Sequence, residues 1–429
     1  MAVIRQAKIK TKCILTFALL FSLLYRFFVD YLHVFSACRY LIDLSLFILV
    51  VMTYRHRKKM NRTQKELYRF VLVYYVYCLV TYFFNFQSPV FFVYGSIYQF
   101  RYYVFAMLCL IWYQKKDVEK ISSYIDVLFY INAMITFYQY FVKGIIGDYL
   151  GGLFGSVQGC NAYSNMLLIV VLTISGMKYL EKKEKTIVFG LKLAICFAIA
   201  AFAELKFFFV EFLILIIFAV FFTGFSWKKF ALSIVAFIAL VGGFTVFTNT
   251  YSYGKDFLNI NVWIQLATSG GYSGGYGGIG EVNRLTFASV IVQRFLNTPL
   301  KMLFGLGLGN CSYSSISIFN TPFYEMNYSS RYEWFTSSHT LLEQGWVGFA
   351  FYIMFFILFF VKAVRELKKQ GADRAACYTA EIMAVMGFVL MIYNNSLTME
   401  SGFLFYFAAM LPFIKSSRID DKGVAKWKI

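Results

Sequence analysis

Runs of apolar residues separated by short polar connections cover most of the chain. Twelve runs approach the roughly 20 residues that a membrane-crossing helix needs. They are 13–29, 40–54, 70–86, 89–113, 121–142, 165–180, 187–203, 207–224, 230–248, 340–361, 376–393 and 403–414. The pattern predicts an all-α polytopic membrane protein with about twelve transmembrane helices and a large outer loop between helices 9 and 10. The chain then divides into helices 1 to 9 (1–248), the loop (249–339), helices 10 to 12 (340–414) and a basic tail (415–429).

Composition agrees with a membrane protein. Of the 429 residues, 60% are hydrophobic and 15% are charged, whereas soluble domains have about 25% charged residues. The eight cysteines are scattered, mostly within apolar runs, and none forms a C-x-x-C pair. This spacing indicates neither a metal site nor a disulfide framework.

The net charge of +19 is distributed unevenly between the two sides of the predicted membrane. The connections that lie on the same side of the membrane as the N-terminus hold 31 Lys and Arg residues, and those on the opposite side hold 8. The remaining two, Arg26 and Arg101, lie inside spans. The positive-inside rule therefore predicts that both termini are cytoplasmic and that the 91-residue loop 249–339 faces outward. The excess positive charge then faces anionic lipid, so we expect no nucleic-acid partner.

The outer loop and the start of the next helix hold the candidate chemistry. His339 opens the tenth span, where a neutral imidazole beside a helix N-terminus can accept a proton. Arg284, Arg294 and Arg331 precede it, and guanidinium groups bind diphosphate in a bidentate manner. The alternatives are an incidental histidine beside capping serines and arginines that reach lipid headgroups.

Two further patterns lie in this loop. The run G-L-G-L-G-N (305–310) lacks the spacing of a dinucleotide fingerprint, and we expect a tight turn or a close backbone approach. Apolar residues at helical spacing between Leu285 and Leu296 predict a helix lying on the membrane or bundle. Asn283, Arg284 and Arg294 fall off that stripe, so the helix should turn them away from the bundle.

Charged side chains within or beside spans are costly in hydrocarbon and are functional candidates by default. Arg101 lies near the middle of the fourth span, and Lys206 lies at the outer turn before the eighth. The alternatives are a hydrogen-bonded residue inside the bundle for Arg101 and an interfacial position for Lys206. No D-x-D or E-x-D pair occurs in the outer loops, so a metal-dependent glycosyl transfer would lack its carboxylates.

These features together resemble the O-antigen polymerase and O-antigen ligase superfamily of bacterial envelope glycosyltransferases. The resemblance covers about twelve spans and a large outer loop with an Arg (Arg284) ahead of a Gly-x-Gly run. It continues with His339 leading into Glu-x-Gly-x-x-Gly, which begins at Glu343, and with a Gly-to-Asn stretch (155–165) that includes Asn161. Only four residues separate His339 from Glu343, fewer than is usual in the family.

The resemblance implies transfer of an oligosaccharide from polyprenyl diphosphate to a sugar hydroxyl at the outer face of the bacterial cytoplasmic (inner) membrane. His339 would be the base, and Arg284 with Arg294 or Arg331 would stabilise the leaving diphosphate. Lys206, Arg101, Glu343, Asn161 and Trp334 are further candidates for substrate binding. No metal or cofactor is expected. A flippase and a chain-length regulator of the same pathway are the expected partners.

The sequence leaves two alternatives open. One is a ligase that moves finished glycan to a lipid or protein acceptor. The other is a polysaccharide-repeat flippase, although no internal repeat is visible and a flippase does not need so long an outer loop.

The predicted topology can be tested by cysteine labelling. Ser273→Cys should react with a membrane-impermeant reagent in spheroplasts, because residue 273 lies in the outer loop. Lys183→Cys should react only after permeabilisation, because its loop belongs to the Lys/Arg-rich side. Labelling of Lys183→Cys from outside would overturn the orientation.

Overall fold

The computed structural model describes residues 2–54, 60–85, 87–222, 281–314 and 316–414, with a few isolated positions between 234 and 261. Regular structure in these ranges is entirely helical and contains no β-strand. The first eight helices are α1 (Ala2–Asp30), α2 (Tyr40–Thr53), α3 (Arg62–Asn85), α4 (Pro89–Trp112), α5 (Lys115–Phe141), α6 (Asn161–Leu180), α7 (Thr186–Phe202) and α8 (Lys206–Phe222). The remainder are α11 (Phe287–Arg294), α12 (Pro299–Phe304), α13 (Pro322–Asn327), α14 (Thr336–Leu367), α15 (Arg374–Tyr393) and α16 (Gly402–Met410).

The helices coincide with eleven of the twelve apolar runs, and the ninth run lies outside the described residues except for a few isolated positions. By length and composition, seven helical segments of the described chain could cross a membrane. They are Lys10–Asp30, Ser36–Thr53, Arg62–Asn85, Lys115–Phe141, Asn161–Leu180, Thr336–Leu367 and Arg374–Tyr393. The all-helical, multi-pass prediction is thus confirmed, whereas the count of twelve stays a prediction. The segments 268–280 and 415–429 also lie outside the described residues.

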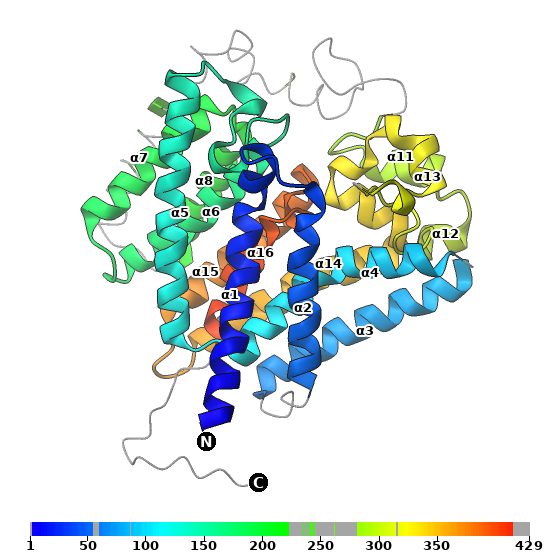
Figure 1. Ribbon diagram of the computed structural model, residues 1–429, viewed down its shortest axis with the longest axis horizontal. Helices are drawn as coiled ribbons and strands as arrows, with labels where there is room; N and C mark the ends of the chain where they lie inside the picture. Colours follow the sequence, from blue (N-terminus) through cyan, green and yellow to red (C-terminus); the bar gives the residue numbers. More distant parts are fainter. Residues whose placement is uncertain are drawn as a thin grey trace.

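Connections predicted to share a side of the membrane contact one another at the same end of the bundle (Figure 1). At one end the contacts are Lys12–Asp117 at 2.5 Å, Lys183–Asp373 at 2.7 Å and a hydrogen bond of 3.0 Å from Gln64 to the Phe413 carbonyl. At the other end, Tyr31 donates to the Gly152 carbonyl at 2.8 Å and Gln87 to the Leu308 carbonyl at 2.6 Å. We call this second end the loop end, because α11 to α13 lie there.

The helices differ in how much of their surface is covered. Residues of α6 and α16 are buried on nearly all sides, so these two helices form the centre of the bundle. In contrast, α2 and α3 expose large apolar side chains, with Phe47 66% and Phe84 70% accessible. Such faces suit contact with lipid rather than with water.

Helix α14 is interrupted six residues after His339. Gly345 has φ 62° and ψ −171°, so the helix is broken between an initial part ending at Gln344 and the long remainder. The break removes the helical donors for the carbonyls of Leu342 and Glu343. The backbone amides of Leu306 and Gly307 donate to these carbonyls instead, at 3.0 Å and 2.8 Å. The close backbone approach predicted for 305–310 is thereby confirmed.

Two glycines make this contact possible. A Cβ atom on Gly305 would lie 2.4 Å from the Glu343 carbonyl carbon, and one on Gly345 would lie 2.4 Å from the Leu303 carbonyl oxygen. Both residues also adopt backbone conformations that are essentially restricted to glycine. The Gly-x-Gly run and the first glycine of the Glu-x-Gly motif therefore belong to one packed junction.

The predicted orientation of the helix after the tether was partly wrong. Leu296 is buried as the stripe requires, but Leu285 is 63% exposed and Asn283 is buried. The regular helix α11 begins only at Phe287, so residues 283–286 do not follow its periodicity. As a result, Arg284 packs onto the end of α15 rather than turning away.

Gly345→Ala should lower the thermal stability of the detergent-solubilised protein by at least about 2 kcal/mol. The backbone strain costs about 1–3 kcal/mol, and the overlap with Leu303 adds a similar amount. Gly190→Ala is the matched control, because Gly190 lies in α7 with open space around it and alanine favours a helix. Equal melting temperatures for the two variants would contradict the role given to the break.

Candidate functional site

His339 lies in the first turn of α14, in the short part of the helix before the break. Its ring stands between two tyrosines, with the Tyr332 ring 6.2 Å away and nearly parallel, and the Tyr98 ring 6.2 Å away and edge-on. Nε2 of His339 is 3.4 Å from Oε1 of Glu343, one helical turn later. The four-residue spacing places the imidazole and the carboxylate side by side on one helix face.

The segment that follows the Gly-x-Gly run fixes the Glu343 carboxylate. Glu343 is buried, and its Oε1 accepts hydrogen bonds of 3.0 Å from the Cys311 backbone amide and from the Ser312 hydroxyl. Tyr332 supports the same segment by donating to the Cys311 carbonyl at 2.7 Å. We call His339 and Glu343 the His–Glu pair.

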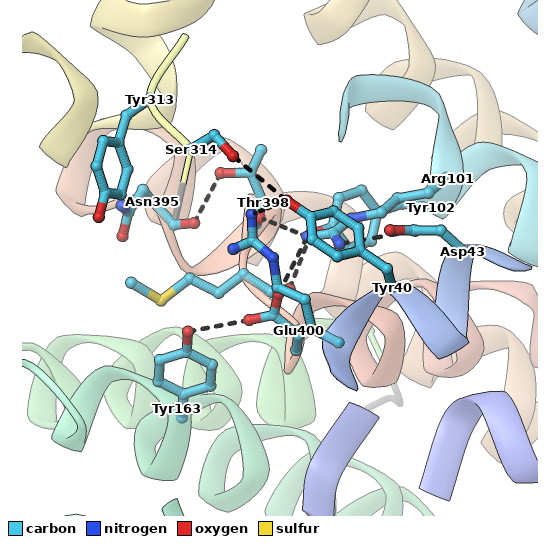
Figure 2. Close-up of polar contacts among 12 residues, drawn as sticks. Tyr40, Asp43, Arg101, Tyr102, Tyr163, Tyr313, Ser314, Asn395, Thr398 and Glu400 are labelled. Atoms are coloured by element: carbon cyan, nitrogen blue, oxygen red, sulfur yellow. Dashed lines mark hydrogen bonds and ion pairs between the residues drawn. The ribbon is translucent and has the colours of Figure 1, made fainter. Parts of the chain in front are cut away.

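A second polar region is centred on Arg101 and Glu400 (Figure 2). Arg101 is buried in α4, and its guanidinium is 3.5 Å from Glu400 and 3.8 Å from Asp43. The guanidinium also donates to the Tyr102 hydroxyl at 2.6 Å and to the Thr398 carbonyl at 3.3 Å. These contacts compensate a charge that would otherwise be expensive to bury.

Two more arginines surround Glu400. Arg39 donates to the hydroxyls of Tyr40 and Tyr94 at 3.0 and 3.2 Å, and the Arg26 guanidinium lies 5.2 Å from the ring of Tyr163. The Tyr163 hydroxyl in turn donates to Glu400 at 3.1 Å.

The charges around Glu400 favour its ionised form. Burial alone would raise the pKa of Glu400, but Arg101, Arg39 and Arg26 together hold it below its usual range. Glu400 therefore stays a carboxylate at neutral pH and balances the surrounding guanidinium groups. We call Arg26, Arg39, Asp43, Arg101 and Glu400 the arginine cluster.

Tyr98 connects the two regions. The Arg101 guanidinium lies 5.3 Å from the centre of the Tyr98 ring, and the centre of the His339 ring lies 6.2 Å from the same ring. Ser314, just after the segment that holds Glu343, lies 3.3 Å from the hydroxyl of Tyr40 beside the cluster. A base candidate and a group of cations are therefore neighbours near the loop end.

The arginines predicted for diphosphate binding have other partners in the structure. Arg284 donates to the Tyr393 carbonyl at 3.0 Å and packs on the Tyr393 ring. Arg331 is 3.4 Å from Glu281 and stacks over Trp334. Arg294 is exposed at the end of α11. Arg284 also packs on Phe335, whose carbonyl accepts a hydrogen bond from the His339 amide.

Asn161 and Lys206 lie against the turn between α7 and α8. Asn161 donates to Asp148 at 2.9 Å and to the Ala203 carbonyl at 3.0 Å. Lys206 forms an ion pair of 2.8 Å with Glu204. Asn161 is two residues from Tyr163, so the start of α6 borders the arginine cluster even though Asn161 itself ties loops together.

Sequence reasoning missed most of the arginine cluster. Arg26 and Asp43 are charged residues within apolar runs, which is a signal for function that could have been followed. Glu400 and Glu381 are the only charged residues between 376 and 414, and this isolation was the available signal for Glu400. Arg39 lies in a short connection and offered no pattern.

Across the described ranges, no group of three or more His, Cys, Asp or Glu residues is placed to hold a metal ion. Comparisons with known proteins add no assignment: no protein-family model matches the chain, and no curated protein matches it. The geometry of the site therefore carries the functional argument.

Arg101→Met should destabilise the protein by about 3–5 kcal/mol, because it leaves Glu400 and Asp43 buried without their shared cation. Adding Glu400→Gln should recover part of the loss. Arg62→Met, at an arginine that is 94% exposed, should change stability by less than about 0.5 kcal/mol. Thermal unfolding in detergent measures all three, and an Arg101→Met variant as stable as Arg62→Met would contradict the compensation described here.

Proposed function

We propose that the protein polymerises lipid-linked oligosaccharide repeat units, in the manner of O-antigen, capsule or exopolysaccharide polymerases. Glycan would pass from polyprenyl diphosphate to a sugar hydroxyl at the outer face of the bacterial cytoplasmic membrane. The observation that carries the proposal is the pairing of His339 and Glu343 beside a buried group of arginines at one end of a membrane-type helical bundle.

His339 is the proposed general base. If Nε2–H is directed at Glu343, the ring is held in one tautomer and Nδ1 keeps the lone pair that accepts a proton. The oxygen of the acceptor hydroxyl then attacks the anomeric carbon of the donor glycan and loses its proton to His339. The bond from that carbon to the diphosphate oxygen breaks, and the diphosphate leaves with the electron pair.

The leaving diphosphate develops negative charge, and cations that are already in place lower the barrier most effectively. Arg101 packs on Tyr98 and Arg39 donates to Tyr94 on the same helix, while Arg284 packs on Phe335 at the start of α14. Lys206, Arg294 and Arg331 are proposed to bind substrate at the edge of the same site. In this scheme positive charge and one base supply the catalysis, without a metal.

Aromatic residues near the loop end suit a glycan substrate. Trp334 stacks under Arg331, and Tyr313 is 50% exposed beside Ser314 at the edge of the arginine cluster. Exposed aromatic faces stack on the C–H faces of sugar rings, while nearby hydroxyls and amides bond to sugar hydroxyls. Asn395 and Ser314, which Figure 2 shows near Tyr313, are the side chains proposed for such bonds.

A single in vitro reaction tests the proposal. Purified protein in detergent receives one oligosaccharide repeat on polyprenyl diphosphate, with a chelator and no other acceptor. A polymerase uses this molecule as donor and acceptor, so a ladder of longer glycans and free polyprenyl diphosphate should appear. His339→Ala should slow the ladder by about 10²- to 10⁴-fold, the usual effect of removing a positioned base.

The control is His56→Ala, which removes a histidine of the basic connection between the second and third spans and should leave the rate unchanged. A ligase would leave the substrate intact until a separate acceptor was added, and a flippase would never alter it. Absence of a ladder with every lipid-linked repeat tested would refute the polymerase. A full-rate ladder from His339→Ala would keep the polymerase but remove His339 as its base.

A further inference from the structure

Glu400 is held among cations in a position that the proposed chemistry does not use. It lies in the connection 394–401 between α15 and α16 and is only 4% exposed. One carboxylate oxygen is 3.5 Å from Arg101, and the other accepts from Tyr163 at 3.1 Å. Figure 2 shows Glu400 between Tyr163 and the guanidinium groups.

The surrounding charges are balanced only while Glu400 is present. Arg26 lies 3.9 Å from Asp30, and Arg101 lies 3.8 Å from Asp43, so two further carboxylates accompany the three arginines. Withdrawal of Glu400 would leave an excess of one positive charge in a largely buried site. Such a site attracts an anion more strongly than the same charges would in water.

The arginines also retain unused donors. Within the described part of the chain, the Nε atoms of Arg26, Arg39 and Arg101 are buried and have no hydrogen-bond partner. Buried donors are normally satisfied, so three unpartnered guanidinium nitrogens on the arginines that act on Glu400 require an explanation. A carboxylate cannot serve them all, whereas a diphosphate offers more acceptor oxygens that match the guanidinium fork.

We propose that the Glu400 carboxylate occupies the position among Arg26, Arg39 and Arg101 where the substrate diphosphate binds. The lipid-linked diphosphate would displace this carboxylate on binding. This inference rests on the proposed function for the identity of the anion. It assigns the main diphosphate contacts to the arginine cluster rather than to Arg284, Arg294 and Arg331. Glu400 then keeps the cations ordered and compensated while the site is without substrate.

The connection that carries Glu400 is joined to the helix that carries His339. The Asn394 carbonyl accepts hydrogen bonds of 3.1 Å from both the amide and the hydroxyl of Thr336, at the start of α14. Asn395 donates to the Glu333 carbonyl at 3.2 Å, just before that helix. Displacement of Glu400 would therefore move the first turn of α14, which positions His339. Binding of the donor diphosphate would in this way be linked to the position of the base that acts on the acceptor hydroxyl.

The test measures binding of farnesyl diphosphate to the full-length protein in detergent by isothermal titration calorimetry. Glu400→Gln keeps the shape of the side chain and removes the competing charge, so farnesyl diphosphate should bind about tenfold more tightly. Arg39→Gln should bind it at least tenfold more weakly. Glu325→Gln is the matched control, since Glu325 is exposed on α13, and its affinity should equal that of the unaltered protein.

Tyr163→Phe supplies a second variant if Glu400→Gln does not fold, because it alters no charge. It removes the hydroxyl that holds Glu400, so farnesyl diphosphate should bind about two- to fivefold more tightly. Unchanged or weaker binding in the folded Glu400→Gln or Tyr163→Phe variant overturns the proposal, as does an absence of binding to every form. Because the readout needs no glycan transfer, tighter binding without a ladder would uphold this inference while refuting the polymerase.

Discussion

The interruption of α14 at Gly345 is the constraint on which the rest of the site depends. A helix that breaks inside a bundle leaves carbonyls without donors, and an unpaired buried carbonyl is costly. The segment around Gly305 and Gly307 supplies those donors. In doing so it brings Cys311 and Ser312 to the carboxylate of Glu343, which already lies beside His339 on the same helix. One backbone requirement therefore fixes the loop against the carboxylate that contacts the imidazole.

Buried charge is the second organising feature. Arg101 lies deep in α4, where its charge is stable only because Asp43 and Glu400 approach from two other elements. Such pairs contribute little net stability, but they are strongly selective for one arrangement, because every other arrangement leaves a charge uncompensated. The arginine cluster therefore determines how α1, α2, α4 and the 394–401 connection meet, and it places guanidinium groups, balanced by carboxylates, close to the His–Glu pair.

Much of the fold was accessible from the sequence because hydrophobic periodicity is a local property. Apolar runs long enough for a membrane mark helices directly, and eleven of them coincide with helices in the described residues. The candidate site was accessible only in part. His339 and Glu343 share one helix, so their contact follows from a spacing of four residues. The partners of Arg284 did not follow from its spacing, since they come from α15, 109 residues away.

The sequence by itself determined the all-helical membrane character, the asymmetry of charge between the two ends, the tight glycine run and the histidine at a helix start. Each depends on residue type and short-range spacing, which a single chain displays. Only the tertiary structure decided that the glycine run meets the break at Gly345, that Arg26, Arg39 and Arg101 surround Glu400, and that Tyr98 contacts both Arg101 and His339. The reason is physical. Residues separated by up to several hundred positions are brought together by helix packing, and packing geometry leaves no trace in local composition.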